Sequence, residues 1–537
     1  MLEIQTQAAS RKYPKHPGVV YSYGTAGVRM QALLLDCAMY TTGILAALRS
    51  KALGGAHVGV MITASHNPPQ DNGVKVVDPL GSMLEALWEK YVTQLANSAA
   101  EDLPATVRAI AGKEGVDLGV AAHVVVARDS RESSPRLAGA VLAGVGSVPA
   151  LEFRDLGLMT TPQLHYITRT LNDCAFGEPL ENGYYIKLAA AFKSIVGTLS
   201  DPIDITIDSA NGIGAPKIET LVKEYLGGVV RASFVNCAYT EPATLNSDCG
   251  ADYVKTNQRL PKNVVPQPGK LYASFDGDAD RLVHYYQTAT GEFRLLDGDK
   301  ISTLLALFLQ KLLARLPQLQ VNMAVVQTAY ANGLSTDYVV NTLKVQVLCT
   351  PTGVKHLHHE AEKYDVGVYF EANGHGTVIF SPAAEAKIFA YTASSADELD
   401  AIETLRSFTQ LINQTVGDAI SDLLCVLAVL HYLRMSPAEW DLAYTDLPNK
   451  LVKVLVKDRG IFKTTNQELT LVEPVGLQAQ IDAAVAKCAK GRSFVRASGT
   501  EDAVRVYAEA ASSEEVEMLS EAVRSLVELL YGKACGD

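Results

Sequence analysis

A serine with chemically active neighbours stands in the stretch GVMITASHNPPQDNGVKVVDPLG, residues 59–81. The apolar lead-in predicts a buried strand, and the prolines and the Asn-Gly pair that follow predict a turn. We expect the strand end to expose the hydroxyl of Ser65, as a serine nucleophile requires. Lys75 would lie on a return strand, from which it could point back at Ser65. Taken alone, the stretch is more typical of a capped turn, because the G-x-S-x-G elbow of hydrolases is absent.

Three aspartates alternate with small residues in the stretch SFDGDADRLV, directly after a predicted strand; they are Asp276, Asp278 and Asp280. Carboxylates this close repel one another unless a cation lies among them, and hard oxygen ligands suit Mg²⁺ or Ca²⁺. An EF-hand is excluded, because Arg281 and Gln287 stand where its loop needs glycine and glutamate. Three carboxylates leave room for a further ligand, such as a phosphate oxygen. The alternative, a solvated acidic turn, is unusual directly after an apolar strand.

Two further stretches carry residues that bind sugars and phosphates. FEANGHGTV (370–378) alternates Glu371, Asn373 and His375, and Glu and Asn side chains hydrogen-bond hydroxyl and amide groups well. FVRASGTEDAVRV (494–506) offers a guanidinium fork, two hydroxyls and backbone N–H groups, which together suit a phosphate. Its candidate residues are Arg496, Ser498, Gly499, Thr500 and Arg505. Separately, each stretch could be an ordinary polar or capped turn.

The elements that must position these residues follow an α/β pattern. Strand, turn and helix succeed one another over residues 123–144, 204–226 and 323–343, which predicts mainly parallel sheets. In such sheets functional loops gather at the carboxyl ends of the strands, where these motifs stand. The last 90 residues or so instead predict an α+β domain with an antiparallel sheet and a final helix capped by Ser512 or Ser513.

Bulk composition excludes several classes of protein. The chain has 537 residues and a net charge of −12 without a basic tract, which argues against nucleic-acid binding. The N-terminus shows no signal peptide, and no apolar run reaches the roughly 20 residues of a membrane span. The eight cysteines are scattered without a CxxC pair, a pattern typical of reduced thiols in a cytosolic protein. We therefore expect a cytoplasmic protein with no nucleic-acid or membrane partner.

Together, TASHNP, DGDADR, EANGHG and RASGTED resemble the four signature loops of the α-D-phosphohexomutases, in the order that family has them. The resemblance covers essentially the whole chain. It implies three related α/β domains with mixed sheets, followed by a smaller α+β domain, around a central cleft. The pattern of strands and helices along the chain places the domain boundaries at 1–190 for the serine loop, 191–300 for the metal loop, 301–446 for the sugar loop and 447–537 for the phosphate loop.

Three features resemble the branch of that family that acts on N-acetylglucosamine phosphate. Asn373 stands where glucose and mannose mutases usually have serine, the serine loop continues D-N-G-V-K-x-V-D-P-L-G, and the fourth loop reads S-G-T-E-D. Ala497 departs from the expected proline, which should alter loop stiffness more than contacts. The implied reaction interconverts N-acetylglucosamine 6-phosphate and 1-phosphate through a phosphoserine and a 1,6-bisphosphate, and feeds UDP-N-acetylglucosamine synthesis.

The resemblance also implies roles for single residues. Ser65 would carry the phosphate and supply a ligand to one Mg²⁺ per active site, beside Asp276, Asp278 and Asp280. The catalytic residues would be Ser65, His66, Lys75, Arg29 and Arg281, with Lys75 as the first candidate for proton transfer. The residues that bind the phosphosugar substrate would be Glu371, Asn373, His375, Arg496, Ser498, Gly499, Thr500 and Arg505. A hexose 1,6-bisphosphate would be both intermediate and activator, and the enzyme would be a monomer or homodimer.

Three other interpretations stay open. A sister glucose or mannose phosphomutase would differ only in substrate preference. A non-catalytic sugar-phosphate sensor should have lost Ser65, an aspartate or Arg496, and all of these are present. A phosphatase that uses the aspartate motif would leave Ser65 and the fourth loop without a role.

Overall fold

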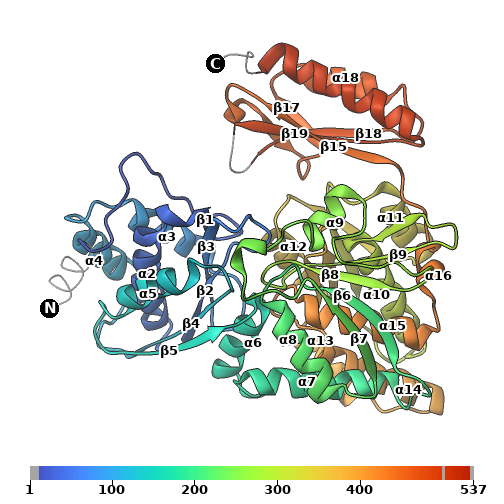
Figure 1. Cartoon of the computed structure of the whole chain (residues 1–537), viewed down its shortest axis with the longest axis horizontal. Helices are drawn as coiled ribbons and strands as arrows, with labels where there is room; N and C mark the ends of the chain where they lie inside the picture. The colour runs from blue at the N-terminus through green and yellow to red at the C-terminus, as the bar shows by residue number, and fades with distance from the viewer. Residues whose placement is uncertain (1–10, 499–501, 533–537) are drawn as a thin grey trace. The chain divides into compact units, whose positions relative to one another are not determined.

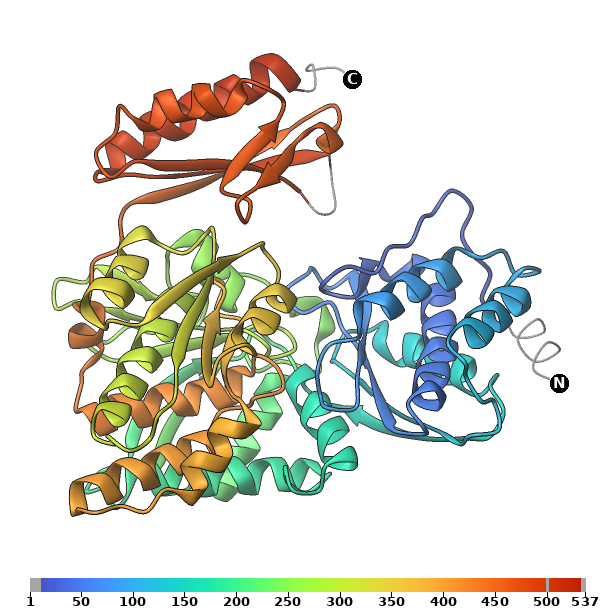
Figure 2. The same ribbon diagram turned by 180° about the vertical axis from the view of Figure 1, so that it is seen from behind.

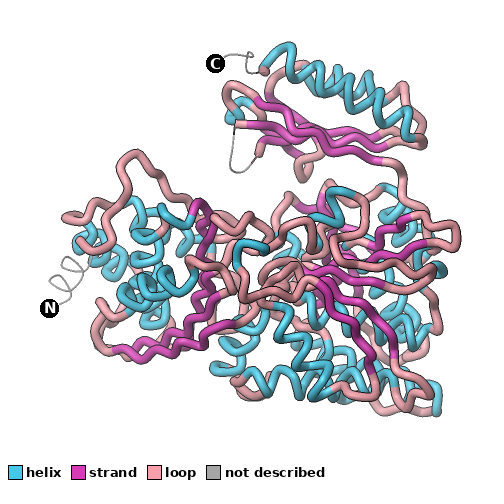
Figure 3. The backbone as a smooth tube through the Cα atoms, viewed as in Figure 1, coloured by secondary structure: helices cyan, strands magenta, loops and turns pink. Residues whose placement is uncertain are grey.

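The computed structural model describes residues 11–498 and 502–532 (Figure 1). The chain folds into two compact units. The first contains the chain up to Gly298 together with Asn373–Val378 and Ile388–Ala438, and the second contains Asp299–Ala372, Ile379–Lys387 and the chain from Glu439. Strands and helices alternate through most of both units, as Figure 3 shows in magenta and cyan.

The first sheet of the first unit has the order β1-β3-β2-β4-β5. Its strands are β1 (Val28–Gln31), β2 (His57–Ile62), β3 (Asp71–Val77), β4 (Ala122–Arg128) and β5 (Leu151–Leu158). Strands β2, β4 and β5 run parallel, while β3 pairs antiparallel with both β2 and β1. Ser65 therefore lies in the turn of a hairpin between β2 and β3. The helices of this region are η1 (Ala32–Leu34), α2 (Asp36–Ala52), α3 (Ala86–Asn97), α4 (Leu103–Lys113), α5 (Ser134–Val145), α6 (Thr161–Asn172) and α7 (Glu181–Val196).

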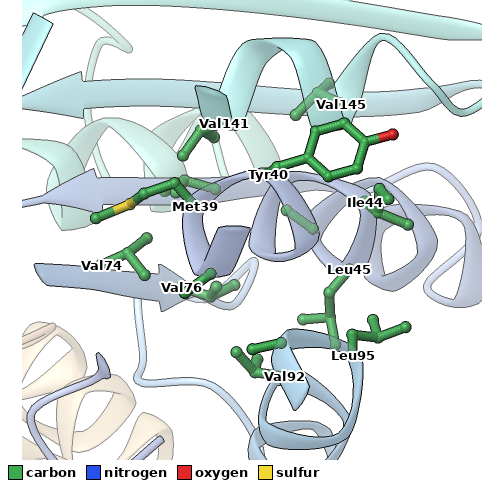
Figure 4. Close-up of a cluster of buried hydrophobic side chains, with 14 of the residues drawn as sticks. Met39, Tyr40, Ile44, Leu45, Val74, Val76, Val92, Leu95, Val141 and Val145 are labelled. Atoms are coloured by element: carbon green, nitrogen blue, oxygen red, sulfur yellow. The ribbon is translucent and has the colours of Figure 1, made fainter. Parts of the chain in front are cut away.

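Helix α2 forms the centre of the core beside this sheet. Nearly all of its residues are buried, because apolar or small side chains occur on every side of the helix. Figure 4 shows Met39, Tyr40 and Ile44 of α2 within a cluster to which β3, α3 and α5 also contribute. Helices α2 and α5 approach so closely that a Cβ at Gly144 would lie 1.9 Å from the carbonyl oxygen of Tyr40.

The second sheet of the first unit has the order β10-β9-β8-β6-β7. Its strands are β6 (Ile203–Asp208), β7 (Val230–Val235), β8 (Tyr272–Phe275), β9 (Leu282–Gln287) and β10 (Phe293–Leu296). The short helices of this region are α8 (Gly214–Thr220), η2 (Leu221–Tyr225), η3 (Pro242–Thr244) and α9 (Ala251–Asn257), and α14 (Ala396–Leu411) and α15 (Ala419–Leu433) complete the unit. Strands β8 and β9 are antiparallel, so the three aspartates also occupy the turn of a hairpin.

A four-stranded sheet in the order β12-β11-β13-β14 belongs to the later part of the chain. Its strands are β11 (Met323–Thr328), β12 (Gln346–Thr350), β13 (Val366–Phe370) and β14 (Gly376–Phe380). The accompanying helices are α10 (Gly298–Ala314), α11 (Gly333–Asp337), η4 (Tyr338–Thr342), α12 (Val354–Ala361), α13 (Pro382–Ala390) and α16 (Pro437–Asp441). Residues 371–375 connect two neighbouring strands of this sheet, β13 and β14.

The C-terminal region is an α+β domain. Its antiparallel sheet has the order β15-β19-β18, with β15 (Asn449–Leu455), β18 (Arg492–Ala497) and β19 (Ala503–Glu509). Helix α18 (Ser513–Tyr531) lies across one face of this sheet (Figure 2), and Ser512 caps it by accepting a hydrogen bond from the Glu515 N–H. The remaining elements are η5 (Arg459–Ile461), β16 (Lys463–Thr465), β17 (Thr470–Glu473) and α17 (Leu477–Val485).

The α/β class with mixed sheets is confirmed, whereas the expectation of mainly parallel sheets is wrong. Two of the four strand pairings in each of the first two sheets are antiparallel. The reason is that each functional loop is the turn of a hairpin rather than a strand-to-helix connection. The domain boundaries at 190, 300 and 446 stay predictions.

The close approach of α2 and α5 makes a stability prediction. Gly144→Ala forces a methyl group into the backbone of α2, and overpacking of this kind lowers the free energy of unfolding by about 1–3 kcal/mol. Gly139→Ala, also in α5, meets no atom within 4 Å and should stabilise the protein by about 0.5–1 kcal/mol through helix propensity. Urea unfolding followed by circular dichroism measures both, and equal effects would contradict this packing.

Candidate active site

Ser65 is the residue around which the candidate site is built. Its hydroxyl Oγ accepts a hydrogen bond from Nη2 of Arg29 at 2.9 Å and donates one to Oδ2 of Asp278 at 3.1 Å. The expectation of an exposed hydroxyl is wrong, because Ser65 is fully buried. The turn between β8 and β9 covers it: a Cβ at Gly277 would lie only 2.5 Å from the Ser65 carbonyl oxygen.

The three aspartates form a buried carboxylate cluster. One oxygen from each of Asp276, Asp278 and Asp280 lies within 4.8 Å of the others. In each residue one carboxylate oxygen is buried and has no hydrogen-bond partner among the described residues. Buried carboxylates without partners are unfavourable, and an ion with hard oxygen preferences such as Mg²⁺ would satisfy all three. The donor set therefore fits the metal that the sequence predicts.

The pKa values of two aspartates in this cluster are shifted in opposite directions. Burial and the neighbouring carboxylates Asp280 and Asp278 raise the pKa of Asp276 well above its usual value. Burial also disfavours the charged form of Asp280, but Lys75, His375 and Arg281 outweigh it and hold the pKa of Asp280 well below its usual value. The carboxylates of the cluster therefore disfavour one another's charged forms, and a bound cation would relieve that repulsion.

The sequence-predicted cations lie around this cluster. Nζ of Lys75, on β3, is 2.9 Å from Oδ2 of Asp280 and 3.5 Å from Oδ2 of Asp278. Nε of Arg281 is 3.9 Å from Oδ1 of Asp280. His66 is different, because burial and the charges of Arg281 and Arg29 lower its pKa to about 2. The imidazole of His66 is therefore neutral at physiological pH.

The third loop reaches the same cluster through His375, and Asn373 supports His375 within the loop. Nδ1 of His375 donates a hydrogen bond to the carbonyl of Asp280, and Oδ1 of Asn373 accepts one from the His375 N–H at 3.0 Å. Gly374 has a φ of 85°, and its Cβ would lie 1.8 Å from the Leu282 carbonyl. Glycine at this position therefore lets the backbone of the third loop approach the backbone of β9 closely. Glu371 belongs to the second unit.

The fourth loop lies in the second unit. Nε of Arg496 is 3.3 Å from Oε1 of Glu468, and the Ser498 N–H donates to the Ala503 carbonyl at 2.8 Å. Arg505 stands directly opposite Arg496 across the pair β18–β19. Gly499 and Thr500 lie outside the described residues.

Sequence reasoning missed four residues that support the serine loop or the carboxylate cluster. Thr161, at the start of α6, donates through Oγ1 to Oδ2 of Asp278 at 2.6 Å. Asp129 and Arg131 follow β4 and form a fully buried ion pair of 2.9 Å, and Asn246 lies before α9. A signal existed for the pair Asp129 and Arg131: both follow the apolar run VVVA within four residues, and charges so close to the end of a buried strand are unusual unless they are paired.

Comparison with known proteins gives the family. Models of phosphoglucomutase/phosphomannomutase match residues 22–103 and 104–186 (the alpha/beta/alpha domain I) and 451–526 (the C-terminal domain). Models of phosphoacetylglucosamine mutase AMG1 match residues 179–283 (domain II) and 297–435 (domain III). The chain thus has the four domains of the phosphohexomutase architecture.

Relatives narrow the assignment. The phosphoacetylglucosamine mutase of Candida albicans is 60% identical, over 97% of this chain and 99% of its own. A crystal structure of N-acetylglucosamine-phosphate mutase, described as a member of the alpha-D-phosphohexomutase superfamily, has a TM-score of 0.96 and 61% identity, over 98% of this chain and 100% of its own. The chain belongs to the phosphoacetylglucosamine mutase family.

Two further crystal structures are of the Aspergillus fumigatus N-acetylphosphoglucosamine mutase. One holds GlcNAc-6P and magnesium, with 49% identity and a TM-score of 0.94; the other, a variant, holds glucose 1,6-bisphosphate, with 48% identity and a TM-score of 0.94. Each covers 98% of this chain and 98% of its own. Within the described residues, the structure contains no helix that is both long and apolar enough to cross a membrane.

The carboxylate cluster predicts that Mg²⁺ stabilises the protein. At about 100 times its Kd, the ion should raise the free energy of unfolding by about 2.7 kcal/mol. Asp276→Asn removes a ligand and a buried charge, so this variant should lose the Mg²⁺-dependent shift without becoming less stable in EDTA. Calorimetry with Mg²⁺ and with EDTA measures the shift. The control Asp204→Asn, an exposed residue paired with Arg231, should keep it, and a full shift in Asp276→Asn would contradict the metal site.

Proposed function

We propose that this protein interconverts N-acetylglucosamine 6-phosphate and N-acetylglucosamine 1-phosphate, with Ser65 as the residue that carries the transferred phosphoryl group. One observation carries the proposal: the Ser65 hydroxyl contacts both the Arg29 guanidinium and a buried carboxylate cluster that fits Mg²⁺. Membership of the family supports the same reaction. Relatives that match this chain over essentially their whole length are named as mutases of N-acetylglucosamine phosphate.

The first half of the reaction starts from the phosphoserine form. The bond between phosphorus and Oγ of Ser65 breaks as a bond forms to the free hydroxyl of the bound sugar phosphate, which yields the 1,6-bisphosphate. Arg29, Lys75 and Arg281 neutralise the charge on the transferring group, and positioning together with charge neutralisation supplies most of the catalysis. When bound to the three aspartates, Mg²⁺ adds positive charge at the phosphoryl oxygens. A variant of the Aspergillus fumigatus relative binds glucose 1,6-bisphosphate, a molecule of the same kind as this intermediate, and this supports the first half of the reaction.

Proton transfer needs a group beside the Ser65 oxygen. We propose Lys75 for this role, because its Nζ lies 3.5 Å from Oδ2 of Asp278. The same oxygen accepts the hydrogen bond of the Ser65 hydroxyl. It would donate a proton toward Oγ as the phosphoryl group departs and recover one from the attacking sugar hydroxyl. His66, being neutral, would contribute hydrogen bonding rather than charge.

The second half reverses the transfer after the bisphosphate has turned over, so that the other phosphate returns to Ser65. We propose that Glu371, Asn373 and His375 bind the sugar hydroxyls and the N-acetyl group. The phosphate that does not react would be bound by Arg496, Ser498, Gly499, Thr500 and Arg505. A phosphate loop that accepts either end of the sugar lets one site perform both halves. The 1-phosphate product would serve UDP-N-acetylglucosamine synthesis in the cytoplasm.

³¹P NMR tests the reaction. The protein is mixed with N-acetylglucosamine 6-phosphate, Mg²⁺ and a trace of hexose 1,6-bisphosphate, and parallel samples contain glucose 6-phosphate or the Ser65→Ala variant. We expect a 1-phosphate signal that is strongest from the N-acetyl sugar and falls at least about 1,000-fold in Ser65→Ala, because no acceptor oxygen remains. Turnover of glucose phosphate alone would move the protein to a sister mutase. Inorganic phosphate alone would indicate a phosphatase, and the absence of any change would indicate a sensor.

A further inference from the structure

Arg131 directs both terminal nitrogens of its guanidinium group at the backbone of the serine loop. Nη2 donates hydrogen bonds to the carbonyls of Ser65 at 2.8 Å and Asn67 at 2.9 Å. Nη1 donates to the carbonyls of Pro68 at 2.6 Å and Asp71 at 2.9 Å. The remaining donor, Nε, binds Oδ2 of Asp129 at 2.9 Å. One buried side chain thus gathers four carbonyls of a single loop, an arrangement that only the forked donors of arginine permit.

The Ser65 N–H is fixed by the same ion pair. Ser65 N donates to Oγ1 of Thr63 at 3.0 Å, and that hydroxyl donates in turn to Oδ2 of Asp129 at 2.8 Å. Both the amide and the carbonyl of Ser65 are therefore connected to the pair formed by Asp129 and Arg131. This pair is inaccessible to solvent, with no exposed side-chain surface on either residue.

A second domain holds the same carbonyls from the other side. Nδ2 of Asn246 donates to the Ser65 carbonyl at 3.0 Å and to the Asn67 carbonyl at 3.2 Å. Asn246 precedes α9 in the region that carries the metal loop, and the Gly277 backbone of that loop abuts the Ser65 carbonyl. The serine loop is thus joined to the metal loop through its backbone as well as through the contact between Ser65 and Asp278.

The conformation held in this way is one that serine rarely adopts. Ser65 has a φ of 50°, in the left-handed region that favours glycine. Such a conformation persists only where the surroundings over-determine it, and it is typical of functional sites. Here it places Oγ between Arg29 and Asp278 while the carbonyl faces Arg131 and Asn246.

We propose that Arg131 and Asn246 are positioning residues for phosphoryl transfer: they hold the backbone of Ser65 in its left-handed conformation and so aim Oγ at the carboxylate cluster. This inference rests on the proposed function of Ser65 and assigns neither residue a contact with substrate. A displacement of about 1 Å at a reacting atom can lower a rate by about 100-fold, so a loosened loop should reduce kcat while binding of the sugar phosphate is kept.

The principal test is Arg131→Lys, which keeps the charge beside Asp129 but loses the fork. We expect kcat to fall about 100-fold while KM for N-acetylglucosamine 6-phosphate stays within about 3-fold. The matched control is Arg128→Lys. Arg128 ends β4, the strand that precedes Arg131, and pairs with Asp155 at 3.0 Å; among the described residues its side chain forms no hydrogen bond or ion pair with the serine loop, so the kcat of Arg128→Lys should stay unchanged.

Asn246→Asp provides a second variant should Arg131→Lys fail to fold. It replaces the amide donor with a carboxylate that faces two carbonyl oxygens, and it should lower kcat in the same way. Asn263→Asp is its control, since Asn263 has a φ of 67°, close to the 58° of Asn246, but its side chain donates a hydrogen bond to the Asn236 side chain instead. An unchanged kcat in both test variants, or a rise in KM with kcat intact, would overturn the proposal.

Hydrogen exchange separates this proposal from the reaction itself. In both test variants the backbone amides of residues 65–72 should exchange at least about 10-fold faster than in the wild type, while the protein remains folded. That result would support the positioning role even if the wild type converted no sugar phosphate, in which case the proposed function would fail alone. Unchanged exchange, or unfolding of both test variants, would overturn the positioning role.

Discussion

The structure depends on one electrostatic constraint: the Ser65 hydroxyl oxygen, which we propose carries the phosphoryl group, lies 3.1 Å from Asp278, a member of a buried carboxylate cluster. Three carboxylates and a phosphoryl group repel one another strongly at low dielectric, so the site must supply positive charge around them. Arg29, Lys75 and Arg281 provide part of that charge from three different loops and strands. The unsatisfied carboxylate oxygens show where a divalent cation would provide the rest.

A shared sheet geometry brings the charged groups together. In each of the first two sheets, the functional loop is the turn of a hairpin, β2–β3 or β8–β9. On the side of the first hairpin strand, two parallel strands continue the sheet, which gives the orders β3-β2-β4-β5 and β9-β8-β6-β7. The chain order differs: the serine hairpin precedes its parallel strands, whereas the metal hairpin follows its own. In both sheets the functional loop follows the central strand, β2 or β8, and the Gly277 backbone of one loop abuts the Ser65 carbonyl of the other.

The sequence was sufficient for the class of fold and for most side chains of the site. Ser65, Lys75 and the three aspartates could be recognised because each motif combines unusual residue types with an apolar strand before it. The burial of Ser65 could not be predicted, since the turn that covers it lies more than 200 residues away in the chain. The charges of Asp129 and Arg131 hinted at a buried pair, but the contacts of Arg131 with the serine loop could not be predicted, because its hydrogen-bond acceptors there are backbone carbonyls, which leave no mark in residue types. His66 is neutral because it is buried and because the charges of Arg281 and Arg29 lower its pKa. Neither cause can be recognised from the residues next to His66 in the sequence.

The most direct measurement is rapid-quench labelling of Ser65. The protein is charged with hexose 1,6-bisphosphate carrying a ³²P label, freed of excess reagent, and mixed with N-acetylglucosamine 6-phosphate and Mg²⁺. If the Ser65 oxygen carries the phosphoryl group, the label is found on the Ser65 peptide and passes to the sugar at a rate no slower than kcat. Label that stays on the protein during turnover, or turnover that continues in Ser65→Ala, would contradict this role of Ser65.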